Sequence, residues 1–447
     1  MTMRLPLAAL GIAIQSVAVL AQVPARVQTE SAATPQSVAT YLDPANGLTL
    51  DDAVVRALER EPALRASRGQ LDVARALQTQ AALRPNPSAS FSQQKEPAGT
   101  DNQSRVEVQW PLDLFRKTGR VAVADREVVA TQLATADRER LLAASVRMKY
   151  GEVATAVRTL SITGELLEAT TRQRTLVAAR VEQGAAPPLD RDMLRVDVQR
   201  LEAERLVQAG SVERRLVELK RLLGMAPDAA LSLRDSLEQL VRREQLAVTT
   251  AVNLDPATLR SDVRQAEAQV AVADAQIDRA QREGQFDVSL FGMYMRSDAG
   301  FPQRGFGPTG DLERVRGVFH YWSAGAMVTL PLLNRNQGAV AAAQAQRTTA
   351  SAQVDAARLT AQAEIAAARV RDLNARRALE AYGNEALNLA RQNLDIVRQT
   401  YELGRGTLLD VLNEQRRYLE LERTYTEVLR EAFESRQTLK EALGEIR

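Results

Sequence analysis

Hydrophobic positions follow two different periods along the chain. Near the C-terminus, Val411, Tyr418 and Tyr425 recur every seven residues, which is typical of the seam of a coiled coil. In contrast, Val106 and Val108 alternate with polar neighbours, and this period of two indicates a strand with one apolar face. The pattern therefore predicts a mainly helical chain with a small β portion.

Proline placement sets the length of the predicted helices. No proline occurs between Pro111 and Pro187, and none follows Pro331. Because proline inside a helix costs about 3 kcal/mol, its absence permits long helices over 118–182 and 337–402, each about 100 Å in length. Shorter helices are expected over 50–83 with a capping box at Thr49 and a kink at Pro62, over 190–223, within 225–253, from Asp255 to about Arg282, and over 407–443.

The chain contains two copies of one pattern. Trp110-Pro111-Leu112 corresponds to Leu330-Pro331-Leu332, and Gly184 corresponds to Gly404. The offset stays at 219 or 220 residues over the whole repeat, which chance does not produce. We divide the chain into a signal peptide (1–21), a flexible leader (22–47), a first repeat (48–224), a connecting segment (225–253) and a second repeat (254–447).

The N-terminus indicates export. Arg4 precedes an apolar stretch that is shorter than the ~20 residues a membrane-spanning helix needs, which is typical of a cleaved signal peptide. The residues up to 47 are rich in Pro, Ser, Thr and Ala, as flexible segments are. No later segment is apolar enough to predict a transmembrane helix.

Composition removes several classes of function. The chain has no cysteine and one histidine, His320, which excludes disulfides, zinc–thiolate sites, cysteine nucleophiles and a lipid on an N-terminal cysteine. A net charge of +2 argues against binding of nucleic acid. The sequence has no phosphate-binding glycine loop, catalytic triad or cluster of metal ligands, so we expect no enzyme, no cofactor and no metal site.

Each repeat carries a pair of predicted strands. The pair of the first repeat lies within about 87–112, and the pair of the second lies within about 286–330, with a glycine-rich loop expected over 297–317. Strands of about ten residues suit a tilted crossing of a bilayer, and they equally suit a soluble hairpin that caps a coiled coil. Four strands leave two unpaired edges, which lipid does not tolerate, and the smallest membrane barrels have about eight strands. Strands that enter a membrane would therefore have to be shared by several chains.

The order helix, strand, strand, very long helix, helix, present twice behind a signal sequence, resembles the TolC-type outer-membrane efflux proteins over 48–444. The most specific stretches are 330–338 (LPLLNRNQG) and 401–412 (YELGRGTLLDVL). The first of these, together with 286–291 (FDVSLF), is most similar to the heavy-metal branch of the family, the cobalt–zinc–cadmium type.

The resemblance implies a homotrimer in the outer membrane. Each chain would give four strands to a shared 12-stranded β-barrel in the lipid and its helices to a periplasmic α-barrel tunnel. The tunnel would conduct passively after docking with a periplasmic adaptor (a membrane fusion protein) and an inner-membrane pump of the resistance-nodulation-division type. Two alternatives are a periplasmic coiled-coil adaptor, which would have one hairpin and a β-rich module, and a structural coiled-coil scaffold, which would not need four strands of bilayer length.

The resemblance also places a gate at the turns over 184–190 and 404–410, the periplasmic tip. Asp410 stands at the family's acidic gate position, and three copies in a trimer would form a negative ring that favours cations. Alternatively, Asp410 caps the helix that begins at Thr407, and both interpretations are compatible. The family's second acidic position is Asn413 here, followed by Glu414, which lies about 100° further round the helix.

Tyr401 and Asp190 match positions that link neighbouring helices in the closed state. The hypothesis is that they bond across helices and hold the tip shut; the alternative is that Tyr401 is merely buried in the coiled coil. Residues expected to contact the adaptor at the tip are Gly184, Leu189, Gly404, Thr407, Leu408 and Leu409. Residues expected at the junction of barrel and tunnel are Pro111, Gly119, Pro331 and Gly338. Gly164 and Gly383 are expected where the long helices bend or where neighbours approach closely.

Overall fold

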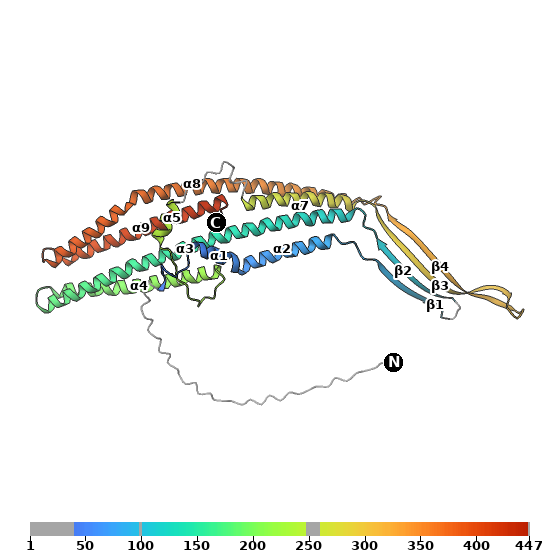
Figure 1. Ribbon diagram of the computed structural model, residues 1–447, viewed down its shortest axis with the longest axis horizontal. Helices are drawn as coiled ribbons and strands as arrows, with labels where there is room; N and C mark the ends of the chain where they lie inside the picture. Colours follow the sequence, from blue (N-terminus) through green and yellow to red (C-terminus); the bar gives the residue numbers. More distant parts are fainter. Residues whose placement is uncertain (1–39, 98–100, 247–259, 446–447) are drawn as a thin grey trace, which may run out of the picture. The chain divides into compact units, whose positions relative to one another are not determined.

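The computed structural model describes residues 40–97, 101–246 and 260–445 (Figure 1). The predicted signal peptide, most of the predicted leader and the predicted helix start at Asp255 lie outside these ranges. Within them, none of the helices combines the length and the apolar character needed to cross a bilayer.

Two runs of elements follow one another in the same order. The first is α1 (Leu50–Arg60), α2 (Pro62–Ala81), β1 (Ser88–Lys95), β2 (Asn102–Pro111), α3 (Arg116–Glu182) and α4 (Pro188–Leu222). The second is α7 (Ser261–Glu283), β3 (Asp287–Phe306), β4 (Leu312–Thr329), α8 (Gln337–Glu402) and α9 (Leu408–Leu443), with α5 (Leu237–Leu246) between the runs. The long helices α3 and α8 match the predicted ranges to within two residues.

Local side chains decide where the first two helices begin. The Thr49 hydroxyl accepts a hydrogen bond from the backbone N–H of Asp52, which caps α1 as its sequence predicts. The backbone of Glu61 is extended, and Pro62 begins α2. Proline is favoured at a first helical position because an N–H there has no partner within the helix. The predicted kink is therefore a break between two helices.

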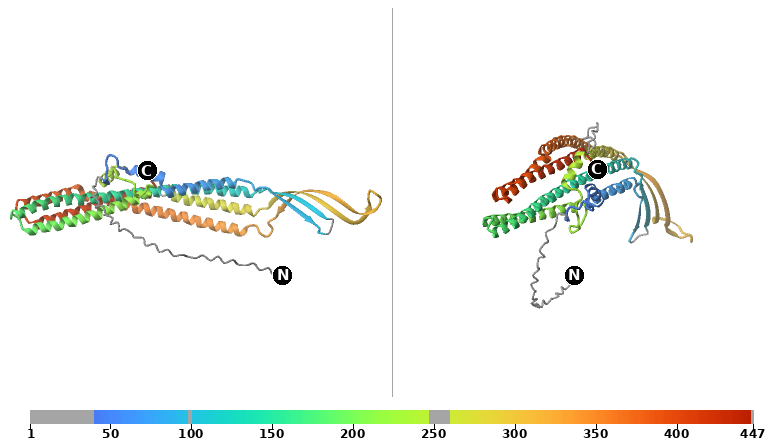
Figure 2. Two further views of the ribbon diagram at one scale, coloured as in Figure 1. Left: turned by 90° about the horizontal axis from the view of Figure 1, so that it is seen from below. Right: turned by 60° about the vertical axis from the view of Figure 1, so that its left-hand side comes forward.

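The helix α3 is the centre of the packing. It contacts α1, α2, α4, α5, α7 and α9 along its length (Figures 1 and 2). The main core lies where α1, α3, α4, α5 and α9 meet, around the buried rings of Tyr150 and Phe433. The Tyr150 hydroxyl donates to the backbone oxygen of Leu48 over 2.7 Å, so the polar end of the ring is also satisfied. The segment between the repeats, represented by α5, is thus part of the core.

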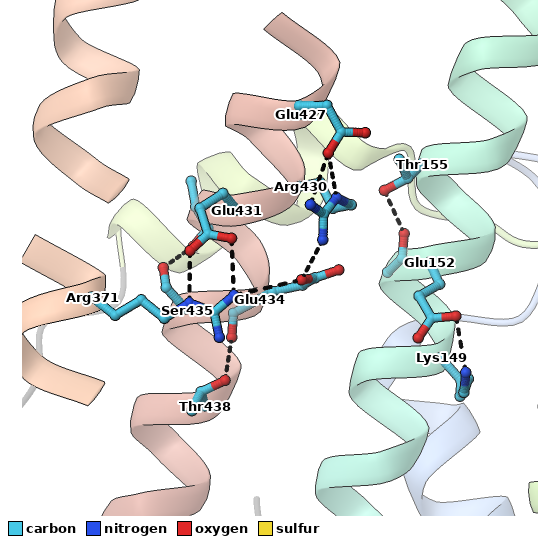
Figure 3. A network of polar contacts seen from close by, with 12 residues as sticks. Lys149, Glu152, Thr155, Arg371, Glu427, Arg430, Glu431, Glu434, Ser435 and Thr438 are labelled. Atoms are coloured by element: carbon cyan, nitrogen blue, oxygen red, sulfur yellow. Dashed lines mark hydrogen bonds and ion pairs between the residues drawn. The ribbon is translucent and has the colours of Figure 1, made fainter. Parts of the chain in front are cut away.

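Charged side chains join α8 to α9. Arg371 of α8 donates to both carboxylate oxygens of Glu431 in α9, over 2.6 and 2.9 Å (Figure 3). On α9, Arg430 bonds Glu434 over 2.6 Å, and Glu434 lies 3.8 Å from Arg371. Arg371 and Glu431 are exposed, and exposed ion pairs contribute only about 0–1 kcal/mol each, so we attribute to this pair the alignment of the two helices more than their stability.

The four strands form one antiparallel sheet in the order β1-β2-β3-β4, so that β1 and β4 are its edges. Residues directly opposite each other in an antiparallel pair point to the same side. The register brings the alternating Val106 and Val108 together with apolar residues of the other strands on one side, here called the apolar face: Phe91, Val106, Val108, Trp110, Leu290, Tyr294, Trp322 and Val328. On the other side, β1 and β2 carry polar residues: Ser90, Ser92, Arg105, Glu107 and Gln109.

The predicted loop over 297–317 is wrong for most of its length. β3 continues to Phe306 and β4 begins at Leu312, so the turn is confined to 307–311. A register shift between Gly300 and Arg304 interrupts the ladder without ending it, as a bulge does. The glycines and prolines of this stretch hid the alternation, because a bulge accommodates residues that a regular strand would exclude.

The predicted junction residues lie where the strands meet the long helices. Pro111 is the last residue of β2, while Pro331 and Gly338 lie on either side of the step from β4 to α8. Gly119, in the first turn of α3, packs against α7, and a Cβ there would come within 2.9 Å of the Cα of Arg279. The absence of a side chain therefore lets α3 and α7 approach closely beside the sheet.

Two ion pairs that the sequence did not reveal also hold this junction. The buried carboxylate of Asp113 lies 2.6 Å from the Arg120 guanidinium. Arg116 at the start of α3 lies 3.3 Å from Asp287 at the start of β3. The first pair joins α3 to the segment that precedes it, and the second joins the two repeats.

The repeat-related glycines of the long helices differ. Gly383 in α8 has φ 46° and ψ 159°, which breaks the helical path. Gly164 in α3 has no such break, and a Cβ there would meet nothing within 4 Å. The expected bend is therefore present in the second repeat, whereas Gly164 marks neither a bend nor a close approach within the described chain.

We predict that Gly119→Ala lowers the thermal unfolding midpoint, because its Cβ would press on the α7 backbone. Gly164→Ala is the matched control and should leave the midpoint unchanged or raise it, since alanine is favoured over glycine in a helix by about 1 kcal/mol. Circular dichroism of the detergent-solubilised protein measures both. Equal midpoints for the two variants would contradict the close approach.

Candidate functional site

The helical hairpins α3–α4 and α8–α9 end in turns of the same geometry. Gly184 and Gly404 both have φ +73°, a conformation in which a side chain is strained. The N–H of Gly184 bonds the oxygen of Val181, and the N–H of Gly404 bonds the oxygen of Tyr401. The next residue of each turn bonds back to Arg180 or Thr400, which completes a Schellman motif in both hairpins. The duplication seen in the sequence is thus repeated in atomic detail.

The two turns differ where the second helix begins. Pro187 and Pro188 begin α4, and no side chain caps this helix. α9 begins with a full capping box, in which the Thr407 hydroxyl accepts from the N–H of Asp410 and the Asp410 carboxylate accepts from the N–H of Thr407. The first start is held by proline rings, and the second by a reciprocal pair of hydrogen bonds.

An apolar cluster joins the hairpins just above the turns. Val177 of α3 and Leu194 of α4 pack with residues of the other hairpin, which are Tyr401, Leu408, Val411 and Leu412. Leu408 is 3% exposed, so the expectation that it contacts an adaptor is wrong: the first turn of α9 directs it into this cluster. Leu189 and Leu409, by contrast, are 65% and 53% exposed.

Two hydrogen bonds cross between the hairpins at the tip. The Tyr401 hydroxyl donates to Oδ2 of Asp190 over 2.9 Å, which is the contact that the hypothesis requires. Arg180 near the end of α3 donates to the backbone oxygen of Glu402 near the end of α8, over 2.7 Å. Burial, and next the Asp190 carboxyl, raise the pKa of Tyr401 to about 12. The hydroxyl therefore keeps its proton, and its role as a donor, throughout the neutral range.

The acidic gate candidates lie in different environments. Asp410 and Asn413 are both exposed, and three residues of helix place them on the same side of α9. The hydroxyl and then the backbone N–H of Thr407 hold the pKa of the Asp410 carboxyl below its usual range. Glu414 is half-buried and lies 3.4 Å from Arg417, so it is engaged on its own helix. Asp410 therefore caps α9. Its exposure is also compatible with a ring of three Asp410 carboxylates in a trimer.

A buried polar layer lies one turn above the apolar cluster, and sequence reasoning missed it. The Gln415 amide donates to the Thr170 hydroxyl over 3.1 Å and to the Asp197 carboxylate over 3.0 Å. All three residues are buried, and they come from α9, α3 and α4. A polar residue in a helix ordinarily indicates a solvated face, so only the structure shows that these three face one another.

No cluster of acidic and histidine side chains with the geometry of a metal site occurs among the described residues. The features that can act at the tip are therefore the crossing hydrogen bonds, the exposed Asp410 and the two exposed leucines.

Several solved structures with this architecture are described as outer-membrane channels. The family model described as Outer membrane efflux protein matches residues 53–225 and 257–445, one segment in each repeat. No curated protein matches the chain. The solved structure of CusC is 18% identical, with a TM-score of 0.69 over 92% of this chain and 97% of that chain.

Two further solved structures are similar. VceC of Vibrio cholerae is 21% identical, with a TM-score of 0.68 over 89% of this chain and 96% of that chain. MtrE of Neisseria gonorrhoeae, in its open state, is 18% identical, with a TM-score of 0.68 over 89% of each chain. At sequence identities this low, the similarity to these solved structures establishes a shared fold.

We predict that Gln415→Leu destabilises the protein by about 1–3 kcal/mol, because the buried groups on Thr170 and Asp197 lose their donor. The exposed Gln392→Leu in α8 is the control and should change stability little. The measurement is the unfolding midpoint in detergent. A Gln415→Leu protein as stable as the control would show that the layer contributes nothing.

Proposed function

The chain belongs to the outer membrane efflux protein family, and on this premise we propose that its tip is a gate held closed by the bond between Tyr401 and Asp190. The protein is an outer-membrane efflux channel with a periplasmic tunnel, and its family is not enzymatic. Membership implies a trimeric channel within a tripartite pump.

The two open sheet edges support a barrel shared by three copies. β1 and β4 each present one unpaired edge, and lipid provides no partner for backbone N–H and C=O groups. Pairing β1 of one copy with β4 of the next would satisfy both edges and give twelve strands. The apolar face would then turn toward lipid, and the polar residues of β1 and β2 would turn toward the lumen.

The bond between Tyr401 and Asp190 is the observation that carries the gate. It joins the two hairpins at the tip, below the apolar cluster that they share, and the bond from Arg180 to Glu402 joins them a second time. Opening the tip by moving one hairpin would break both bonds. The second hairpin is the mobile one in this proposal, since Gly383 interrupts α8 while α3 is continuous.

Asp410 supplies the charge of the proposed gate. Its exposure and its lowered pKa favour a charged carboxylate, and three copies around an axis would attract cations. Asn413 on the same side of α9 is neutral, so we propose one acidic ring instead of two. The capping bonds to Thr407 would hold each carboxylate in place within the ring.

The proposed adaptor contact uses the exposed parts of the two turns. Five of the residues expected to contact the adaptor are exposed and stay in the proposed contact: Leu189, Leu409, Gly184, Gly404 and Thr407. The proposed partners are a periplasmic adaptor and a pump of the resistance-nodulation-division type. The stretch 330–338 supports placing the chain in the heavy-metal branch, and a ring of Asp410 would suit cationic cargo.

We predict that Tyr401→Phe raises the conductance of the resting channel in planar bilayers. A hydrogen bond to a carboxyl contributes about 1.5–3 kcal/mol, so its loss should raise the open population at least about tenfold. Tyr41→Phe is the matched control, because it removes a tyrosine hydroxyl that bonds Glu213 away from the tip. Unchanged resting conductance in Tyr401→Phe would count against the gate.

We also predict that Asp410→Asn reduces cation selectivity while keeping the cap, since the asparagine oxygen still accepts from the Thr407 N–H. Asn413→Asp should raise cation selectivity by adding a second ring. Reversal potentials in a salt gradient measure both. If Asp410→Asn retains wild-type selectivity, Asp410 serves only as a cap.

A further inference from the structure

The hairpin of β3 and β4 extends well past the other two strands. β1 ends at Lys95 and β2 begins at Asn102, which pairs with Asp298. Beyond that row, β3 and β4 pair only with each other for at least six residues, about 20 Å of strand. A two-stranded hairpin alone in water is marginally stable, so this extension is a segment that a partner could stabilise.

The extension carries its arginines on one side. Arg316 pairs with Gly300, and Arg304 lies directly opposite Arg314. Along β4, Arg314 and Arg316 have the same parity as Trp322, so they continue the apolar face. Arg296 of β3, opposite His320, belongs to the same side. We call Arg296, Arg304, Arg314 and Arg316 the basic band.

The basic band carries more positive charge than the acids around it can balance. Like charges directly opposite each other in a sheet are destabilising, yet Arg304 faces Arg314. Among the described residues, no salt bridge involves any of the four arginines. Asp298 lies on their side, and Glu313, which alternates to the other side, still lines the same cavity as Arg314 and Arg316. The Asp101 carboxylate accepts from the backbone N–H of Gly300, the residue opposite Arg316. The side chains of Arg304 and Arg314 are exposed.

The position of the band selects its partner. All the helices join the sheet at one end of its strands, so with the tunnel in the periplasm the turn at 307–311 lies on the exterior side (Figure 1). Along the apolar face the order is an apolar stretch, the aromatic pair Tyr294 and Trp322 with ring centroids 4.7 Å apart, and then the arginines. Aromatic rings of this kind mark the level of lipid headgroups.

We propose that the basic band binds the phosphorylated headgroups of outer-leaflet lipids. Arginine matches phosphate because its planar guanidinium donates two parallel hydrogen bonds to phosphate oxygens. Phosphates between Arg304 and Arg314 would turn a repulsive pair into an attractive bridge. Beyond the band, Phe306 and Leu312 lie opposite each other and are both highly exposed, which suits a segment lying against a lipid surface.

This inference rests on the proposed barrel and is independent of the gate. The test uses the full-length protein in a neutral detergent, immobilised and exposed to bisphosphorylated lipid A or to its dephosphorylated form. The combined variant Arg304→Gln, Arg314→Gln, Arg316→Gln should retain at least about tenfold less of the phosphorylated lipid than wild type. Binding to wild type should also weaken as salt rises.

A matched pair of single variants guards against misfolding. Arg314→Gln removes one guanidinium from the band, and Arg105→Gln removes an exposed one from the opposite side of β2. Arg314→Gln should lower retention of the phosphorylated lipid, whereas Arg105→Gln should not. Neither should change retention of the dephosphorylated form.

Three results would overturn the inference. They are equal retention of the phosphorylated lipid by wild type and the combined variant, equal retention of both lipid forms by wild type, and full displacement by inorganic phosphate at equal concentration, which would indicate a site for a free anion. Insertion of the same proteins into vesicles is measured in parallel. A wild-type chain that does not insert would overturn the barrel itself, and this surface with it.

Discussion

A very long helix has no core of its own, and this constraint governs the rest of the structure. α3 must bury apolar residues along its 67 residues, and it does so against a succession of neighbours. It packs on α7 beside the strands, on α1, α5 and α9 in the middle, and on α4 toward the tip. The repeats therefore cannot fold as separate domains, because the first supplies the helix around which the second packs.

Narrow helical seams offer little room for large apolar side chains, and polar residues occupy several of their buried positions. Gln415 with Thr170 and Asp197 is one such layer, and Tyr401 with Asp190 is another. The polar groups of the first layer are hydrogen-bonded only when three helices keep their register, and those of the second only when two helices do. Polar layers thus fix the alignment of helices that could otherwise slide along an alanine- and leucine-rich surface.

Much of this organisation could be predicted from the sequence. The absence of proline gave the long helices to within two residues, and the resemblance to the family led to the contact between Tyr401 and Asp190. The failures have physical causes. Leu408 lies in a helix's first turn, where a turn-like sequence does not reveal burial, and the length of β3 was hidden by residues that usually end a strand.

The partners of buried polar residues were the least predictable part. Gln415 meets Asp197 across 218 positions of sequence, and a helical pattern records which side a residue faces but not what it faces. The same limit applied to Asp113 and Arg120 at the junction, because burial of a carboxylate depends on the packing of segments that are irregular in sequence.

The break at Gly383 has a consequence for symmetry. The two repeats give each chain two similar hairpins, so a closed ring of three chains would approach sixfold symmetry if the hairpins were equivalent. Because α8 is interrupted and α3 is not, hairpins that alternate around the axis differ in shape. In the proposed trimer the aperture at the tip would then be triangular, with its width set by three α8–α9 hairpins and its outline held by three others.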